Sequence, residues 1–316
     1  MEYRDQLSEY VQDMIKASNY DSRLVNQFTS SQDEYNDAIN EIEDIASDRD
    51  INQVKGLYHR YPTKVLIFPT ERCMGSCRFC FRKNIIHDTD LNWEDFDLIV
   101  KYLNDNPIVN EVIFSGGDPF AYDLQKLTTM INRIMSIDTI RIVRIHTRIL
   151  TYNPYLITED FINAIHGEKP LYMVFHINSH LELTEVAREK VKMLTNSGIC
   201  CFSQSALLKG VNDTKQDLEA LFTSLIFNKI KPYYLFHPDR VKGTGHFYVP
   251  LKKGIELYNS LYNYISGLAM PQYLFNIPNG HGHCIVDLHN IESKSANRYL
   301  IKTWENNLVD YADVDV

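Results

Sequence analysis

The chain has 316 residues, of which 44 % are hydrophobic and 23 % charged, a composition typical of a protein with a packed core. Its formal net charge of −9 argues against non-specific binding to nucleic acid or to an anionic membrane surface. The sequence has no apolar run approaching the roughly 18 residues of a membrane span, and its first residues lack the pattern of a signal peptide. We therefore expect a cytoplasmic protein with neither a nucleic-acid nor a membrane partner.

The first 60 residues are polar and acidic, with apolar residues at helical spacing. This pattern predicts two or three peripheral helices. We place an N-terminal helical extension at 1–54, a main domain at 55–290 and a C-terminal tail at 291–316.

From residue 64 onward, short β-branched or aromatic runs alternate with segments of helical periodicity. Each run is almost continuously apolar, as in strands covered on both faces of a parallel sheet. The expected strands are 64–68, 111–115, 141–146, 171–177, 200–207, 231–237 and 272–277. The expected helices between them include 93–105, 123–135, 183–198 and 214–229.

Six consecutive strand–helix units predict an α/β fold, a partial (open) (β/α)6 barrel of the TIM type, with strand 272–277 added at its edge. An open doubly wound sheet is the alternative that the list of strands does not exclude. In both folds the catalytic groups belong at the carboxyl ends of the strands.

Three of the six cysteines, Cys73, Cys77 and Cys80, follow the first of these strands in a C-x3-C-x2-C spacing. Three thiolates on one loop can ligate three irons of a [4Fe–4S] cubane and leave the fourth iron open for chemistry. A zinc site would need a fourth Cys or His at a matching spacing, and His87, the nearest histidine, has a loose offset. Phe79, directly before the third cysteine, further favours the cluster.

Polar residues also follow the next four strands. The segment SGGDP ends the second strand, and its glycines Gly116 and Gly117 allow backbone to approach a ligand closely. Alone, this segment is equally explained as a tight turn, and one strand-end histidine as a hydrogen-bonded structural residue. Four successive polar strand ends are harder to explain as core.

These motifs resemble those of the radical S-adenosylmethionine superfamily, and within it the lysine 2,3-aminomutase family. The resemblance covers roughly 55–285 and is carried by the runs 59–73, 203–213, 231–247 and 249–273. It implies reductive cleavage of S-adenosylmethionine to a 5′-deoxyadenosyl radical, which abstracts hydrogen from the substrate. It also implies a small amino-acid-like substrate and an electron donor such as flavodoxin or ferredoxin.

The resemblance assigns roles to individual residues. It places Phe79 near the adenine and the glycine segment at the methionyl amine. The predicted contacts to S-adenosylmethionine are Phe79, Gly116, Gly117, Asp118, Arg144, His146, His176 and Gln204.

The resemblance also implies how a substrate is held. Arg82 matches an arginine that binds the substrate carboxylate, and Asp239 an aspartate that binds the distal amine, pairings that suit a guanidinium and a carboxylate. A solvated loop carboxylate is the alternative for Asp239. Arg60 matches an arginine that holds the phosphate of pyridoxal phosphate.

Two positions depart from the family pattern. The run IPNGHGHC places His283 where the family has the lysine that binds pyridoxal phosphate, and Asn276 replaces a second substrate-binding aspartate. We therefore favour an enzyme that acts without pyridoxal phosphate and catalyses epimerisation, dehydrogenation, elimination or decarboxylation. The alternatives are a 2,3-aminomutase of a small amino acid that uses pyridoxal phosphate, and a non-enzymatic iron–sulfur protein.

Overall fold

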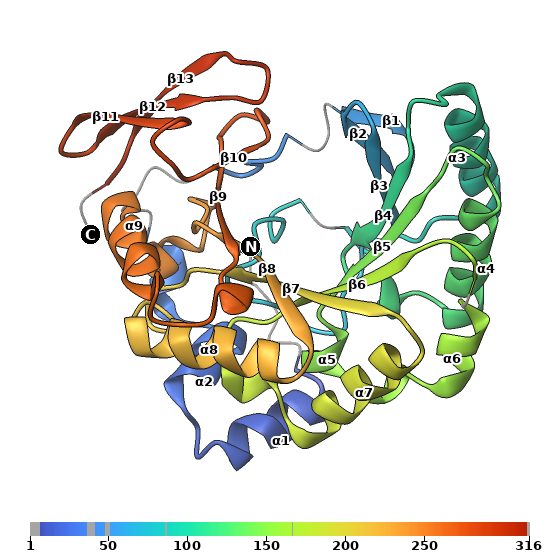
Figure 1. The fold of residues 1–316 in the computed structure, drawn as a ribbon, viewed down its shortest axis with the longest axis horizontal. Coiled ribbons are helices and arrows are strands. Elements are labelled where there is room, and N and C mark those ends of the chain that lie inside the picture. Colours follow the sequence, from blue (N-terminus) through green and yellow to red (C-terminus); the bar gives the residue numbers. More distant parts are fainter. Residues whose placement is uncertain (1–6, 37–41, 48–50, 86, 166, 315–316) are drawn as a thin grey trace.

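The computed structural model describes residues 7–36, 42–47, 51–85, 87–165 and 167–314. Figure 1 shows one curved sheet with helices along its outer side. Ten strands lie side by side in chain order, and every pair from β3 to β9 is parallel. The strands are β1 (Asn52–Val54), β2 (Leu57–Tyr61), β3 (Lys64–Thr70), β4 (Glu111–Gly116), β5 (Ile142–Thr147), β6 (Leu171–His176), β7 (Cys200–Ala206), β8 (Ile230–Phe236), β9 (Gln272–Asn276) and β10 (His283–Ile285).

The strand order confirms the predicted partial barrel. A doubly wound sheet reverses its strand order at a switch point, whereas this order runs without reversal from β1 at one edge to β10 at the other. The sheet is therefore open, and the six strand–helix units lie where the apolar runs predict them. The helices of this part are α3 (Trp93–Asp105), α4 (Leu124–Met135), α5 (Ile149–Tyr152), α6 (Glu159–Ala164), α7 (Glu185–Asn196), α8 (Lys215–Phe227) and α9 (Leu251–Leu261).

The crossover helices begin at residues that cap their free backbone N–H groups. Asn92, Asp123, Thr184 and Thr214 each accept a hydrogen bond from the backbone N–H three residues further on, at the start of α3, α4, α7 and α8 respectively. Each of these helices then packs an apolar stripe against the sheet, and the buried side chains of the helices and the strands together form the main core.

The N-terminal region is helical only in part. Helices α1 (Glu9–Ala17) and α2 (Ser22–Phe28) and the 3-10 turn η1 (Gln32–Tyr35) lie in this region, whereas 52–61 forms strands β1 and β2 in place of the expected helix. Gly56, at a φ of +78°, makes the turn between the two strands. The aromatic side chains of β2 favour a strand once β3 is available for antiparallel pairing. Residues 37–41 and 48–50 lie outside the described residues.

The C-terminal segment 291–316, expected as a tail, contains a second sheet. Strands β11 (Ile291–Ser295), β12 (Arg298–Lys302) and β13 (Leu308–Ala312) pair antiparallel beside β10 and α9 (Figure 1). Their buried side chains share one apolar cluster with Leu251, Phe275 and Ile277. Among the described residues, no helix has the length and apolar character needed to cross a membrane.

Replacing Ile301 tests how far this small sheet stabilises the barrel edge. Ile301 is fully buried, so Ile301→Ala should lower the free energy of unfolding by roughly 2–5 kcal/mol, measured by urea denaturation. Ile285, on neighbouring β10, is 42 % exposed, and Ile285→Ala is the matched control, expected to change stability by less than about 0.5 kcal/mol. Equal effects of the two changes would contradict this packing.

Candidate active site

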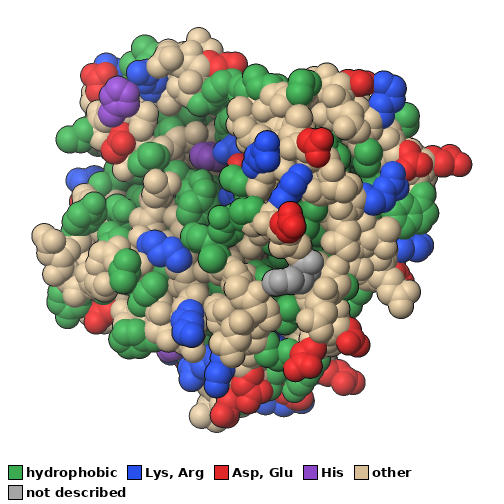
Figure 2. Space-filling view, turned by 45° about the vertical axis from the view of Figure 1, so that its right-hand side comes forward, with side chains coloured by type: hydrophobic (Ala, Val, Ile, Leu, Met, Phe, Trp, Pro, Cys, Tyr) green, Lys and Arg blue, Asp and Glu red, His purple; other side chains and the backbone are tan. Residues whose placement is uncertain are grey.

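A cavity of about 350 Å³ lies along the carboxyl ends of the barrel strands. The loop that follows β3 lines one end, and the turn between β9 and β10 lines the other. On the face drawn in Figure 2 the surface is hollowed, and hydrophobic side chains gather in the hollow. The cavity therefore lies where a barrel places its active site.

The predicted cysteines share one loop and one wall of this cavity. Cys73, Cys77 and Cys80 are all partly buried and all line it. Within the described part of the chain, no group of three or more Cys, His, Asp and Glu side chains stands arranged to hold a metal ion. The thiolates of a cubane each bind a different iron, so they need a wider arrangement than the ligands of one ion.

The electrostatic surroundings differ among the three thiols. Burial raises the pKa of Cys80 to about 11 and also raises that of Cys73. Cys77 instead receives a hydrogen bond of 2.8 Å from Arg148 Nη1 and lies 3.2 Å from the Tyr152 hydroxyl. Arg148 thus places a cation and an N–H donor directly against one of the three sulfurs.

The glycine segment at the end of β4 lies directly against the cysteine loop. Gly117 N–H donates to the Thr70 carbonyl at 3.1 Å, and Asp118 N–H to the Arg72 carbonyl at 2.8 Å. A Cβ atom on Gly117 would lie 2.1 Å from the Arg72 carbonyl oxygen, and Gly116 adopts a φ of +118°. Glycine is therefore required here by close backbone approach and by conformation.

The carboxylate of Asp118 braces the neighbouring strand. It is buried and accepts hydrogen bonds from Thr147 Oγ1 at 2.7 Å and from the backbone N–H groups of Arg148 (2.7 Å) and Phe120 (3.0 Å). Burial raises the pKa of Asp118. Its side chain thus holds the ends of β4 and β5 together, while the turn presents backbone to the cavity.

The remaining predicted contacts line the same cavity at different depths. Phe79 packs against His176, with ring centroids 5.3 Å apart, and Gln204 pairs with His176 across β6 and β7. Burial lowers the pKa of His176 to about 3 and that of His146 well below its usual range, so both rings are neutral. Arg144 lies deeper and forms an ion pair of 2.5 Å with Glu111.

The predicted substrate residues also face the cavity. Asn276 Nδ2 donates to both carboxylate oxygens of Asp239, at 3.2 and 3.1 Å. The guanidinium of Arg82 lies over the rings of Phe68 and Phe81. Burial raises the pKa of Asp239 to about 7, although Asn276 and Arg82 both act to lower it.

His283 lies in an aromatic wall at the far end of the cavity. Its Nδ1 is 3.1 Å from the hydroxyl of Tyr61, and its ring also contacts Tyr234 and Phe236. Burial lowers the pKa of His283 to about 4, so the ring is neutral. Arg60 donates to the backbone carbonyls of Gly280 and Ala46 near the same turn.

Sequence reasoning missed several residues of this site. Lys64 lines the cavity at the start of β3, with its ammonium nitrogen 4.6 Å from the Tyr61 ring centroid. The signal that could have indicated Lys64 is its position on the first predicted strand, 64–68, which lines the cavity. Gln27 and Glu182, which contact Arg148, were missed because only the folded chain brings them together.

The residues present fit the cofactors of a radical S-adenosylmethionine enzyme. Three thiols, a turn that a Cβ atom would fill, and the buried His146 Nε2, which has no partner among the described residues, all border one cavity. The radical SAM superfamily model matches residues 67–222. Fold, site and match together define a radical SAM enzyme, and membership of that superfamily implies S-adenosylmethionine and a [4Fe–4S] cluster.

Several individual proteins are similar to this chain. A putative L-lysine 2,3-aminomutase of Aquifex aeolicus is 32 % identical, over 83 % of this chain and 72 % of that protein. The glutamate 2,3-aminomutase of Clostridioides difficile is 30 % identical, over 86 % and 67 %. A radical SAM methyltransferase structure from Sphaerobacter thermophilus is 15 % identical with a TM-score of 0.48, over 69 % of this chain and 68 % of that one.

The chain belongs to the lysine 2,3-aminomutase family of radical SAM enzymes. It spans between 58 % and 75 % of the length of curated relatives such as the L-lysine 2,3-aminomutases of Bacillus subtilis and Acetoanaerobium sticklandii.

Substituting Gly117 tests the proposed cofactor turn. Gly117→Ala should displace the backbone of Glu71 and Arg72 and weaken S-adenosylmethionine binding by about tenfold or more, equivalent to ~1.4 kcal/mol, as measured by calorimetry on reconstituted protein. Gly267→Ala is the control, because an added Cβ there meets no described atom within 4 Å. Wild-type binding by folded Gly117→Ala would contradict a role for this turn.

Proposed function

We propose that this protein holds a [4Fe–4S] cluster on Cys73, Cys77 and Cys80 and abstracts hydrogen from a small amino-acid-like substrate without pyridoxal phosphate. When bound, the cluster and S-adenosylmethionine supply the 5′-deoxyadenosyl radical. The observation that carries the proposal is the shared cavity, which joins the three thiols to Arg82 and Asp239. An external one-electron donor of the flavodoxin or ferredoxin class would serve the cluster in the cytoplasm.

Arg82 and Asp239 define the chemistry of the proposed substrate. A guanidinium supports a carboxylate through paired hydrogen bonds, and Asp239 offers carboxylate oxygens to a distal donor. Asn276 already donates to both of those oxygens. Since Asn276 is uncharged, Asp239 and Asn276 together carry at most one negative charge, where two aspartates would carry two. We infer a substrate with a free carboxylate and a distal donor group that need not be an ammonium.

The environment of His283 supports a reaction that omits pyridoxal phosphate. An imidazole offers no amine for a Schiff base, and this ring is engaged by Tyr61, Tyr234 and Phe236 as part of the cavity wall. The reactions open to such an enzyme are epimerisation, dehydrogenation, elimination or decarboxylation.

One observation favours a second candidate, a 2,3-aminomutase that carries pyridoxal phosphate on a different lysine. Lys64 lies in the same cavity as His283, and both contact Tyr61. Burial and the nearby Arg144 lower the pKa of Lys64, which favours the neutral amine needed for attack on an aldehyde.

The cysteine assignment predicts a clear division among the six thiols. Replacing Cys73, Cys77 or Cys80 by Ala should abolish bound iron and 5′-deoxyadenosine formation, because thiolates are the soft ligands of that loop. Cys200→Ala, Cys201→Ala and Cys284→Ala should retain about four irons per chain, measured by iron analysis after anaerobic reconstitution. Loss of iron from Cys284→Ala would contradict a single site on the loop.

The raised pKa of Asp239 predicts how ligand binding depends on pH. Without a ligand, the Asp239 carboxyl group ionises near its pKa of about 7. The distal ammonium of L-lysine interacts best with the ionised carboxylate, so binding of L-lysine should strengthen from about pH 6 to about pH 8. L-norleucine, which lacks that ammonium, should show no such rise, and Asp239→Asn should remove it for L-lysine. Calorimetric titrations in which the two ligands share one pH profile would contradict the assignment.

The same carboxyl group predicts a contribution to stability. Because the pKa of Asp239 is higher in the folded chain than the usual value of about 3.9 in an unfolded one, the folded state binds the extra proton between about pH 4 and about pH 7. The contribution of this group to the free energy of unfolding is present below that window and is lost as pH rises through it. Asp239→Asn should flatten this part of the urea-denaturation profile, and an unchanged slope would contradict burial of the carboxyl group.

Borohydride trapping distinguishes the two candidate functions. Incubation with pyridoxal phosphate followed by reduction should label no lysine of the cavity stoichiometrically, and reductant with S-adenosylmethionine should suffice for turnover. Lys64→Arg is the diagnostic variant, and Lys209→Arg is the control because Lys209 does not line the cavity. Stoichiometric label on Lys64, with activity that disappears when pyridoxal phosphate is stripped, would identify an aminomutase.

A further inference from the structure

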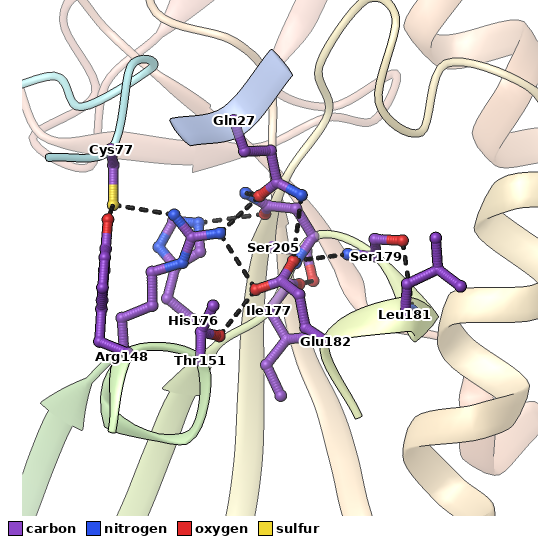
Figure 3. Close-up of polar contacts among 12 residues, drawn as sticks. Gln27, Cys77, Arg148, Thr151, His176, Ile177, Ser179, Leu181, Glu182 and Ser205 are labelled. Carbon is purple, nitrogen blue, oxygen red and sulfur yellow. Dashed lines mark hydrogen bonds and ion pairs between the residues drawn. The ribbon is translucent and has the colours of Figure 1, made fainter. Parts of the chain in front are cut away.

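The N-terminal helix α2 reaches the cysteine loop. Its residue Gln27 is fully buried, and the Gln27 backbone carbonyl accepts a hydrogen bond of 2.9 Å from the N–H of Arg78, which directly follows Cys77. Figure 3 shows the Gln27 side chain descending from α2 toward the guanidinium of Arg148. The segment that precedes the barrel in the chain therefore contacts the loop proposed to hold the cluster.

Arg148 is the link between this helix and the thiol. Its Nη1 donates to Cys77 Sγ at 2.8 Å, while Nη2 donates to Gln27 Oε1 and, at 3.0 Å, to Glu182 Oε2. The side chain is almost fully buried. Its two nitrogens are thus directed at the sulfur on one side and at two fixed acceptors on the other (Figure 3).

The orientation of the Gln27 amide is set by its partners. Its nitrogen donates to the Arg23 carbonyl at 2.8 Å and to Glu182 Oε1 at 3.2 Å, and its oxygen also accepts from Asn178 Nδ2 at 3.1 Å. Both ends of the amide are in use, so the oxygen is held toward Arg148. Without that oxygen, Glu182 is the acceptor left to Nη2, and the guanidinium is free to turn away from the sulfur.

A second buried contact joins the same N-terminal segment to the loop. Glu34 of η1 accepts hydrogen bonds from Arg78 Nε at 2.7 Å and from Lys83 Nζ at 3.1 Å. Arg78 and Lys83 flank Cys80 in the chain, and all three charged groups are nearly inaccessible to water. The loop is therefore held from the N-terminal side at two points.

We propose that Gln27 is a positioning residue for the iron–sulfur centre, holding Arg148 against the Cys77 sulfur so that helix α2 completes the cluster site. This inference rests on the proposed function, in which Cys77 is a cluster ligand. One electron from an external donor adds a negative charge to the cluster. A cation and an N–H···S hydrogen bond at a ligating sulfur stabilise that charge. The contact of Arg148 with Cys77 therefore raises the reduction potential of the cluster.

The test is an anaerobic redox titration of the reconstituted full chain, followed by electron paramagnetic resonance. Gln27→Met keeps the length of the side chain and removes its hydrogen bonds. At a fixed ambient potential it should raise the ratio of oxidised to reduced cluster by about tenfold, which corresponds to a midpoint ~59 mV more negative. Asn26→Ala is the matched control, because this amide lies on the same helix but binds the exposed Gly210 carbonyl and should leave the midpoint unchanged.

The outcomes distinguish a failure of the inference about Gln27 from a failure of the proposed function. A folded Gln27→Met variant with wild-type iron and a wild-type midpoint would overturn the inference. Loss of iron from Gln27→Met alone, with the melting temperature of the apo-protein unchanged, would support it. If Gln27→Met does not fold, Gln27→Asn keeps the buried amide but withdraws its oxygen from Arg148, so it should also lower the midpoint; an unchanged midpoint there would overturn the inference. A wild-type chain that assembles no cluster would instead overturn the proposed function.

Discussion

The structure depends on a charge pair that is buried at the carboxyl ends of the barrel strands. Arg148 and Glu182 are 3.0 Å apart, and almost no water reaches either side chain. A buried pair is tolerated only when its remaining donors and acceptors are also bonded. Glu182 accepts from Thr151 Oγ1 and from the backbone N–H groups of Asn178 and Ser179, at 2.7–2.9 Å.

These bonds fix the relative positions of elements that are distant in the sequence. Removing one partner of a buried pair typically costs 3–5 kcal/mol. An arrangement of these elements that separated Arg148 from Glu182 would therefore be unfavourable. Arg148 follows β5, Glu182 lies after β6, and Gln27 comes from the N-terminal helix. Glu182 and Gln27 both accept from Arg148, which in turn donates to the sulfur of Cys77. The arrangement that stabilises the fold therefore also organises the part of the cavity where the cluster is proposed.

The other end of the cavity contains Asp239, Asn276 and His283 together with several aromatic side chains. Asp239 and Asn276 leave a single carboxylate beside Arg82, and His283 is packed among aromatic rings. A neutral imidazole held in this way shapes the cavity but offers no amine. In the proposed function, the cysteine loop serves radical formation, and Arg82 with Asp239 serves recognition of the substrate.

Local patterns explain why most of the barrel could be predicted from the sequence. The apolar runs and the capped amphipathic segments depend on neighbouring residues, so β3 to β9 and the crossover helices fall where the pattern indicates them. The cysteine spacing and the glycine pair are equally local signals. The short strand β1 and the sheet β11–β13, whose strands are largely polar on their exposed side, carry too little apolar pattern to be recognised.

The missed part of the site depends on contacts between distant residues. Gln27 and Arg148 are 121 residues apart in the chain, and no spacing rule connects them. Lys64 could be placed on a strand, and its pairing with Tyr61 across the β2–β3 turn is local, but its place in the same cavity as His283 depends on how the open barrel curves. The predicted elements and motifs therefore located the cavity and several of its charged residues, whereas the contacts of Gln27, Glu182 and Lys64 are seen only in the folded chain.

The proposed function requires that hydrogen be abstracted from an amino-acid-like substrate without pyridoxal phosphate. Its most direct test is transfer of deuterium from a mixture of fully deuterated amino acids into 5′-deoxyadenosine. The reaction would use reconstituted protein stripped of pyridoxal phosphate, with S-adenosylmethionine and a one-electron reductant, and mass spectrometry would detect the label. We predict deuterated 5′-deoxyadenosine under these conditions; label that appears only after pyridoxal phosphate is added would contradict the claim.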